Sequence, residues 1–175
     1  TSPDTALQVV TDEKAAHDPF PVTDIQQAYI RGRDDSFMLG NISAHSYTEF
    51  SCSQLRTKDL TTAFQLLINK HSMLRCVVHD EQSVILPSPM NYIIKVDDFS
   101  QASPADSETA LLRTRESMSH SVFDLSQWPL FDIRVTLLPE NKSIVHLSYD
   151  LFILDATSMF LMLGEWAVLY DAPGT

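Results

Sequence analysis

Apolar and polar positions in the chain follow helical spacing in some segments and strand spacing in others. Residues 57–70 place an apolar side chain every three or four positions, and Thr57 is suited to cap the resulting helix. Residues 24–30 predict a shorter helix, capped by Thr23 and ending near Gly32. One face of the longer helix is apolar throughout and should be buried; it consists of Leu60, Ala63, Phe64, Leu67 and Ile68.

Shorter segments have the composition and spacing of β-strands. Two further helices are also predicted. One is amphipathic and half exposed and ends near Ser119, and the other is apolar and covers residues 158–170. Mixing strands and helices in this order predicts an α/β fold of the α+β kind, a mixed sheet with flanking helices. The predicted strands cover residues 43–52, 74–79, 83–86, 92–96, 130–138 and 143–150.

The last two predicted strands should form a hairpin whose register follows from their polar residues. A loop with an odd number of residues brings the two polar faces together, whereas an even loop sets each against apolar side chains. We therefore predict the odd loop, which creates a polar seam in a central hairpin. The two polar faces consist of Asp132, Arg134 and Thr136, and of His146, Ser148 and Asp150.

The composition and charge of the chain exclude several classes of function. The chain has 175 residues, of which 44% are apolar, enough for one domain or one lobe of a larger domain. Its net charge of −11 and lack of a basic cluster argue against nucleic acid, and no apolar run is long enough to predict a membrane span. Cys52 and Cys76 are expected to be free thiols, which suits a cytoplasmic protein, and the histidines lack metal-site spacing.

The chain reads as a piece cut from a longer polypeptide. It begins without Met, and its first segment is rich in Ser, Pro, Asp, Thr and Ala. We expect residues 1–19 to be an interdomain linker and residues 20–171 to be the folded unit. Residues 172–175 are expected to begin a second linker.

Two carboxylates flank four large apolar residues at the end of the last predicted strand. In one interpretation Asp155 caps the final helix and Asp150 is solvated; in the other, both fix the geometry of a pocket. An aspartate in an apolar turn should pair with an arginine, and Arg75 and Arg134 lie in core strands. We predict a structural pair of Asp155 with Arg75, or with Arg134 as the alternative.

These residues also match a family. Residues 20–33, FPVTDIQQAYIRGR, resemble the opening signature FPL(T/S)xxQxAYxxGR of heterocyclization domains of nonribosomal peptide synthetases. Asp150, Asp155 and Ser158 match that family's DxxxxDxxS motif, and residues 70–75, KHSMLR, resemble its second motif. Lys70, in place of the usual Arg, is a departure. Residues 128–135, WPLFDIRV, also resemble the family's usual lead-in to the hairpin.

The resemblance implies the N-terminal lobe of a two-lobed, chloramphenicol-acetyltransferase-like fold with an active-site tunnel between the lobes. Such domains condense a carrier-bound acyl or peptidyl thioester with carrier-bound Cys, Ser or Thr, and then cyclize and dehydrate the product to a thiazoline or oxazoline, as in siderophore biosynthesis. The implied catalytic set is Asp150, Asp155 and Ser158. No intrinsic cofactor or metal is implied, because phosphopantetheine arms arrive on peptidyl or aryl carrier domains.

The implied partners are the C-terminal lobe and the carrier domains, and the lobe alone should not turn over. An exposed lobe interface would leave an apolar patch, from which we expect self-association. Two other hypotheses stay open, a non-catalytic docking lobe and the lobe of an ordinary amide-forming condensation domain. The second is disfavoured because Asp150 and Leu151 stand where that class has a His-His pair.

Overall fold

The computed structural model describes residues 12–33 and 44–172. Its main element is a four-stranded mixed sheet in the order β2-β7-β6-β5. Strand β7 (Lys142–Asp150) runs antiparallel to both of its neighbours, β2 (His45–Ser53) and β6 (Phe131–Leu138), while β5 (Lys95–Asp98) is parallel to β6. The predicted α/β fold with a mixed sheet and flanking helices is therefore confirmed.

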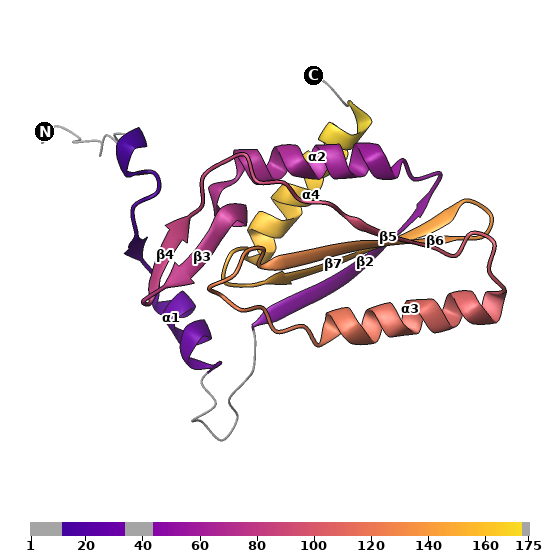
Figure 1. The fold of residues 1–175 in the computed structure, drawn as a ribbon, viewed down its shortest axis with the longest axis horizontal. Helices are drawn as coiled ribbons and strands as arrows, with labels where there is room; N and C mark the ends of the chain where they lie inside the picture. Colours follow the sequence, from indigo (N-terminus) through magenta and orange to yellow (C-terminus); the bar gives the residue numbers. More distant parts are fainter. Residues whose placement is uncertain (1–11, 34–43, 173–175) are drawn as a thin grey trace, which may run out of the picture.

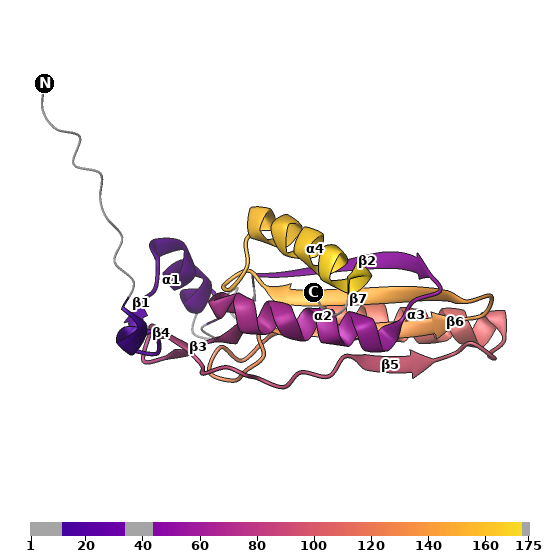
Figure 2. The ribbon, with the colours of Figure 1, turned by 90° about the horizontal axis from the view of Figure 1, so that it is seen from above.

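Helices cover both faces of this sheet. Helices α2 (Thr57–Lys70) and α4 (Ala156–Asp171) lie on one side, and α3 (Pro104–Ser119) lies on the other (Figure 1). The view from above shows the same arrangement (Figure 2). Alternation along the central strands β6 and β7 explains it, because most odd-numbered positions, such as Phe131 and Leu147, are buried and apolar, while Asp132, Arg134, Thr136, His146, Ser148 and Asp150 are polar.

The main core lies between the sheet and the α2–α4 pair. The predicted stripe of α2 is buried there in full. Phe64 sits at the centre, with its ring centroid 5.3 Å from that of Phe131 and 4.8 Å from that of Trp166. The indole N–H of Trp166 donates to the carbonyl of Leu60 at 3.1 Å, which ties α4 to α2.

A second, smaller sheet lies at one end of the molecule (Figure 1). It has the order β1-β4-β3, built from Phe20–Pro21, Gln82–Ile85 and Cys76–His79. The predicted acidic turn joins β3 to β4, and Asp80 and Glu81 both have positive φ there. Helix α1 (Asp24–Arg31) lies at the same end of the molecule.

The hairpin register is confirmed. Leu138 pairs with Lys142, so the loop has the three residues 139–141. Asp132 therefore stands opposite Ser148, and Arg134 opposite His146.

Several predicted boundaries were wrong, and tertiary contacts explain them. The segment predicted as a strand over 74–79 begins as the 3-10 helix η2 (Ser72–Arg75), because Arg75 turns inward to bind carbonyl groups. The strand predicted over 92–96 starts only at Lys95, because Tyr92 uses its hydroxyl and its backbone in hydrogen bonds to other segments. Helix α2 is preceded by Arg56 as its N-cap, and α4 begins at Ala156.

The predicted linkers lie partly outside the described residues, namely residues 1–11 of the first and 173–175 of the second. The described remainder of the first contains the short 3-10 helix η1 (Glu13–Ala15), and His17 hydrogen-bonds the carbonyl of Ile85 at 2.8 Å. Cys52 and Cys76 are free thiols. Within residues 12–33 and 44–172, no helix is both long and apolar enough to cross a bilayer.

Candidate functional site

Three sequence motifs that are far apart in the chain meet at the turn between β7 and α4, residues 150–155. The first motif reaches it from α1, where Gln26 donates from Nε2 to the carbonyl of Phe152 at 2.9 Å. Gln26 is fixed in turn by a capping box with Thr23, whose backbone N–H donates to Gln26 Oε1 at 2.9 Å. The second motif, residues 70–75, shares a pocket with this turn. The motifs therefore form one structural unit.

Asp150 is the buried anchor of the turn. Its side chain is fully inaccessible to solvent and forms an ion pair with Arg33 of the first motif. Its second oxygen accepts the backbone N–H of Phe152 at 2.9 Å. Burial lowers the pKa of Arg33, while the Asp150 carboxylate acts in the opposite direction. The interpretation of Asp150 as a solvated carboxylate is therefore wrong, because the strand ends inside the protein.

Asp155 has a different role, as the N-cap of α4. Its carboxylate accepts the backbone N–H of Ser158 at 2.7 Å, a contact that also lowers the pKa of Asp155. The side chain is exposed, so water solvates its remaining lone pairs. The predicted pair of Asp155 with an arginine is wrong, because a helix cap at the surface has no need of one.

The two arginines proposed as partners of Asp155 are bound elsewhere. Arg75 is buried and donates to the carbonyls of Ile68, Asn69 and Leu86, which closes the end of α2 onto the small sheet. Arg134 pairs with Asp132 on its own strand at 2.8 Å. An arginine does form an ion pair with an aspartate of this turn, but the residues are Arg33 and Asp150.

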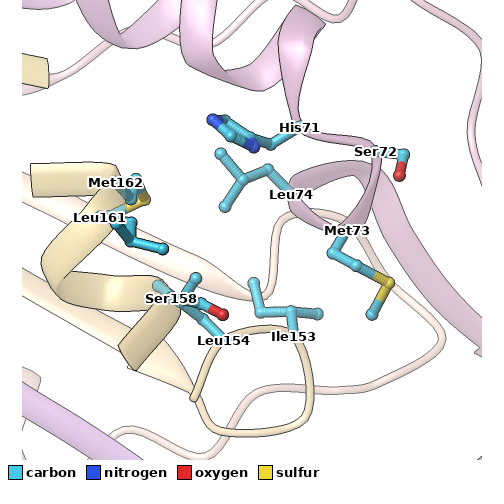
Figure 3. A pocket seen from close by; sticks show the side chains of 9 residues that line it. All are labelled: His71, Ser72, Met73, Leu74, Ile153, Leu154, Ser158, Leu161 and Met162. Carbon is cyan, nitrogen blue, oxygen red and sulfur yellow. The ribbon is translucent and has the colours of Figure 1, made fainter. Parts of the chain in front are cut away.

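A pocket of about 260 Å³ lies beside the turn (Figure 3). The second motif forms one side, and the turn together with the start of α4 forms the other, so that Leu74 of the motif faces Ile153 of the turn. His71 and Ser158 bring polar atoms to opposite sides of an otherwise largely apolar lining. The remaining lining residues are Ser72, Met73, Leu154, Leu161 and Met162.

Two polar groups border the pocket. Ser158 lies in the first turn of α4, and its N–H is used by the Asp155 cap. His71 follows the last residue of α2, and its Nε2 lies 2.6 Å from Glu165 Oε2. Lys70 holds the other oxygen of the same carboxylate at 2.9 Å. These bonds, with His71 contributing most, lower the pKa of Glu165, which is therefore ionised at neutral pH.

The predicted polar seam lies on the other face of the sheet, under α3. His146 is fully buried between Tyr47, whose hydroxyl lies 2.8 Å from Nδ1, and Thr136, whose hydroxyl lies 3.0 Å from Nε2. The Tyr47 hydroxyl donates to Glu49 at 2.6 Å, so Nδ1 of His146 donates to Tyr47 and Nε2 accepts from Thr136. Burial lowers the pKa of His146 and keeps the ring neutral. Arg115 of α3 closes the network with two hydrogen bonds to Glu49.

Within the described part of the chain, no cluster of His, Cys, Asp or Glu side chains is arranged to hold a metal ion.

Sequence reasoning missed two residues of this site, Arg33 and Gln26. Both stand in the first motif, so the signal was present, but only the fold places them against residues 117 and 126 positions further along the chain. Asp150 and Ser158 were singled out from the sequence and do lie at the turn and the pocket respectively.

No family model matches the chain. Among curated proteins, it is 33% identical to bacitracin synthase 1 of Bacillus licheniformis over 98% of this chain, which spans 3% of that protein. It is 29% identical to the pyochelin synthetase PchE of Pseudomonas aeruginosa strain UCBPP-PA14 over 96% of this chain and 12% of the relative. It is 32% identical to the phenyloxazoline synthase MbtB of Mycobacterium sp. strain MCS over 97% of this chain and 14% of that protein.

Solved structures agree with these relatives. The cyclization-docking bidomain of the nonribosomal peptide synthetase EpoB from Sorangium cellulosum superposes with a TM-score of 0.89 at 31% identity, over 95% of this chain and 34% of that one. The nonribosomal peptide synthetase FmoA3 superposes with a TM-score of 0.76 at 33% identity, over 95% of this chain and 16% of that one.

The fold and the three convergent motifs therefore define a lobe of the condensation-domain type. The chain belongs with the cyclization and condensation domains of nonribosomal peptide synthetases, as its motifs predicted. It spans about a third or less of each of these relatives.

Proposed function

We propose that the chain is the N-terminal lobe of a heterocyclization domain, which condenses a carrier-bound acyl or peptidyl thioester with carrier-bound Cys, Ser or Thr and cyclodehydrates the product to a thiazoline or oxazoline. The observation that carries this proposal is the contact between Arg33 and Asp150, since it unites the first and third motifs of that family. Asp150 and Leu151, in place of a His-His pair, favour cyclization over simple amide formation.

Within this function, the two aspartates act by position. Asp150 is occupied by Arg33 and by the N–H of Phe152, and Asp155 by the first turn of α4. Each is therefore a positioning residue that fixes where the turn and the start of α4 face the pocket. Among the three residues of the motif, Ser158 lines the pocket and is the one placed to contact a bound thioester.

The proposed partners are the C-terminal lobe and the carrier domains that deliver phosphopantetheine-bound substrates. Helix α4 supports a covered interface, because it presents large apolar side chains outward. Phe160, Leu161 and Val168 are 67–68% exposed on it. A second lobe packed there would remove this apolar surface from water and complete a tunnel beside the pocket.

The test combines this lobe with the separately expressed following segment of its parent polypeptide and with loaded carrier domains. Mass spectrometry of the carrier-bound product separates condensation from the later loss of one water. We expect cyclized product only when both pieces are present. A stable complex of the two pieces that forms no product would contradict the proposal and identify a scaffold lobe.

A matched pair of variants tests the site. Asp150→Asn removes the charge of a fully buried carboxylate and breaks its ion pair with Arg33, so we expect a loss of about 3–5 kcal/mol in unfolding free energy and loss of product. Asp132→Asn is the control, because Asp132 also pairs with an arginine but is partly exposed, with an expected cost of at most about 1 kcal/mol. Equal stability and activity of the two variants would contradict an anchoring role for Asp150.

A further inference from the structure

A polar pair at the edge of the pocket is not explained by the three motif assignments: His71 lines the pocket, and Glu165 lies behind it. Nε2 of His71 lies 2.6 Å from Glu165 Oε2 across the gap between the end of α2 and the middle of α4. Lys70 fixes the other carboxylate oxygen at 2.9 Å. A carboxylate held from two sides cannot easily rotate away, so it orients the imidazole.

The orientation determines which ring nitrogen is available. A carboxylate only accepts hydrogen bonds, so Nε2 of His71 carries the hydrogen that points to Glu165. In the neutral ring the lone pair is then on Nδ1, and within residues 12–33 and 44–172 Nδ1 makes no hydrogen bond. The side chain is 38% exposed, so a substrate group can reach it.

The surroundings suit proton transfer. Leu74, Leu161 and Met162 line the same pocket, and their apolar surface limits competing water once the pocket is covered. Glu165 and Lys70 are the charged groups that the described residues bring to the ring, and Glu165 stays ionised because its pKa is lowered. An imidazole oriented by a carboxylate is the usual form of a general base.

We propose that His71 is the proton acceptor for the condensation step, with Glu165 as its positioning residue. This rests on the proposed function. When the amine of the carrier-bound amino acid attacks the thioester carbonyl, the C–N bond forms, and Nδ1 of His71 takes the proton from nitrogen. As the C–S bond breaks, the imidazolium returns that proton to the departing sulfur, so no further reactant is required.

The experiment uses the parent polypeptide with both lobes and its carriers. His71→Gln keeps an N–H donor to Glu165 but removes the basic Nδ1, so we expect the rate of condensation to fall on the order of 10²- to 10⁴-fold. KM for the carriers should stay unchanged, and the acidic limb of the pH–rate profile should disappear. Glu165→Gln should cause a smaller loss in kcat, because the ring keeps its base but loses its charged support.

His120→Gln is the matched control, since it makes the same substitution at a ring that is 72% exposed and does not line the pocket. We expect this variant to retain its kcat within about threefold and to keep the acidic limb. A wild-type polypeptide that makes no cyclized product would contradict the proposed function itself. Cyclized product at an unchanged rate in His71→Gln would overturn the role of His71 alone. Should His71→Gln not fold, an unchanged kcat in Glu165→Gln would overturn the pair.

Discussion

The two faces of the central sheet are held by different interactions, although strands β6 and β7 contribute side chains to both. The face under α2 and α4 is apolar, and Phe64, Phe131 and Trp166 pack there ring against ring. The face under α3 is a buried hydrogen-bond network centred on His146. The apolar face tolerates apolar side chains of suitable volume, whereas the polar face requires a partner for every donor and acceptor.

The two faces therefore contribute differently: the apolar face mainly stabilises the fold, and the polar face mainly fixes how the strands are aligned. Burial of apolar area on the α2–α4 face supplies most of the free energy of folding, because it removes large side chains from water. The network under α3 adds little net energy but fixes the register of β2, β6 and β7. Asp150 is the last polar residue of this row on β7. The register of β7 therefore also determines where the turn beside the pocket begins.

Breaking the apolar face should have the largest effect. Phe64→Ala removes a ring that is 1% exposed and packs against three other aromatic side chains, those of Tyr92, Phe131 and Trp166. We expect a loss of about 3–5 kcal/mol in unfolding free energy, measured by urea denaturation. A loss below about 1 kcal/mol would mean that the core closes over the gap and that this face is not the main source of stability.

The contribution of the polar face to the unfolding free energy should depend on pH. Because burial lowers the pKa of His146, the unfolded chain takes up its proton first, and the unfolding free energy falls as pH drops below about 6.5. Hydrogen bonds from Arg115 lower the pKa of Glu49 from 4.5 to about 2, so its contribution is lost only as pH falls through that lower range.

Urea denaturation between pH 7.5 and pH 3 separates the two windows. His146→Gln should remove the upper part of the decline and Glu49→Gln the lower part. His120→Gln is the matched control, because that ring is 72% exposed. An equal change of the pH profile in the control would show that the buried network is not the source.

The smallest effect on stability is expected on the outer side of α4. Phe160→Ser and Val168→Ser each change a side chain that is 68% exposed, so the unfolding free energy should move by no more than about 0.5 kcal/mol. Self-association, measured by light scattering over a range of concentrations, should nevertheless decrease. Val122→Ser, at 50% exposure outside this helix, should leave it unchanged. A monomer at all concentrations before substitution would contradict the expectation of self-association.

Sequence reasoning found the parts of the site that depend on local pattern. The cap at Thr23, the buried stripe of α2 and the odd hairpin loop all follow from the spacing of side chains along one element. It failed to predict which arginine pairs with which aspartate. Arg75 and Arg134 were proposed for Asp155, whereas Arg33 pairs with Asp150 and Asp155 caps a helix.

The sequence by itself determined the class of protein and the mixed α/β fold, because motif residues and periodicity are properties of neighbouring positions. Tertiary structure decided which carboxylate is buried, which arginine meets it, and that His71 and Glu165 lie together beside the pocket. The physical reason is that burial depends on where a strand ends inside the fold. An ion pair between residues 117 positions apart forms only after the chain has folded.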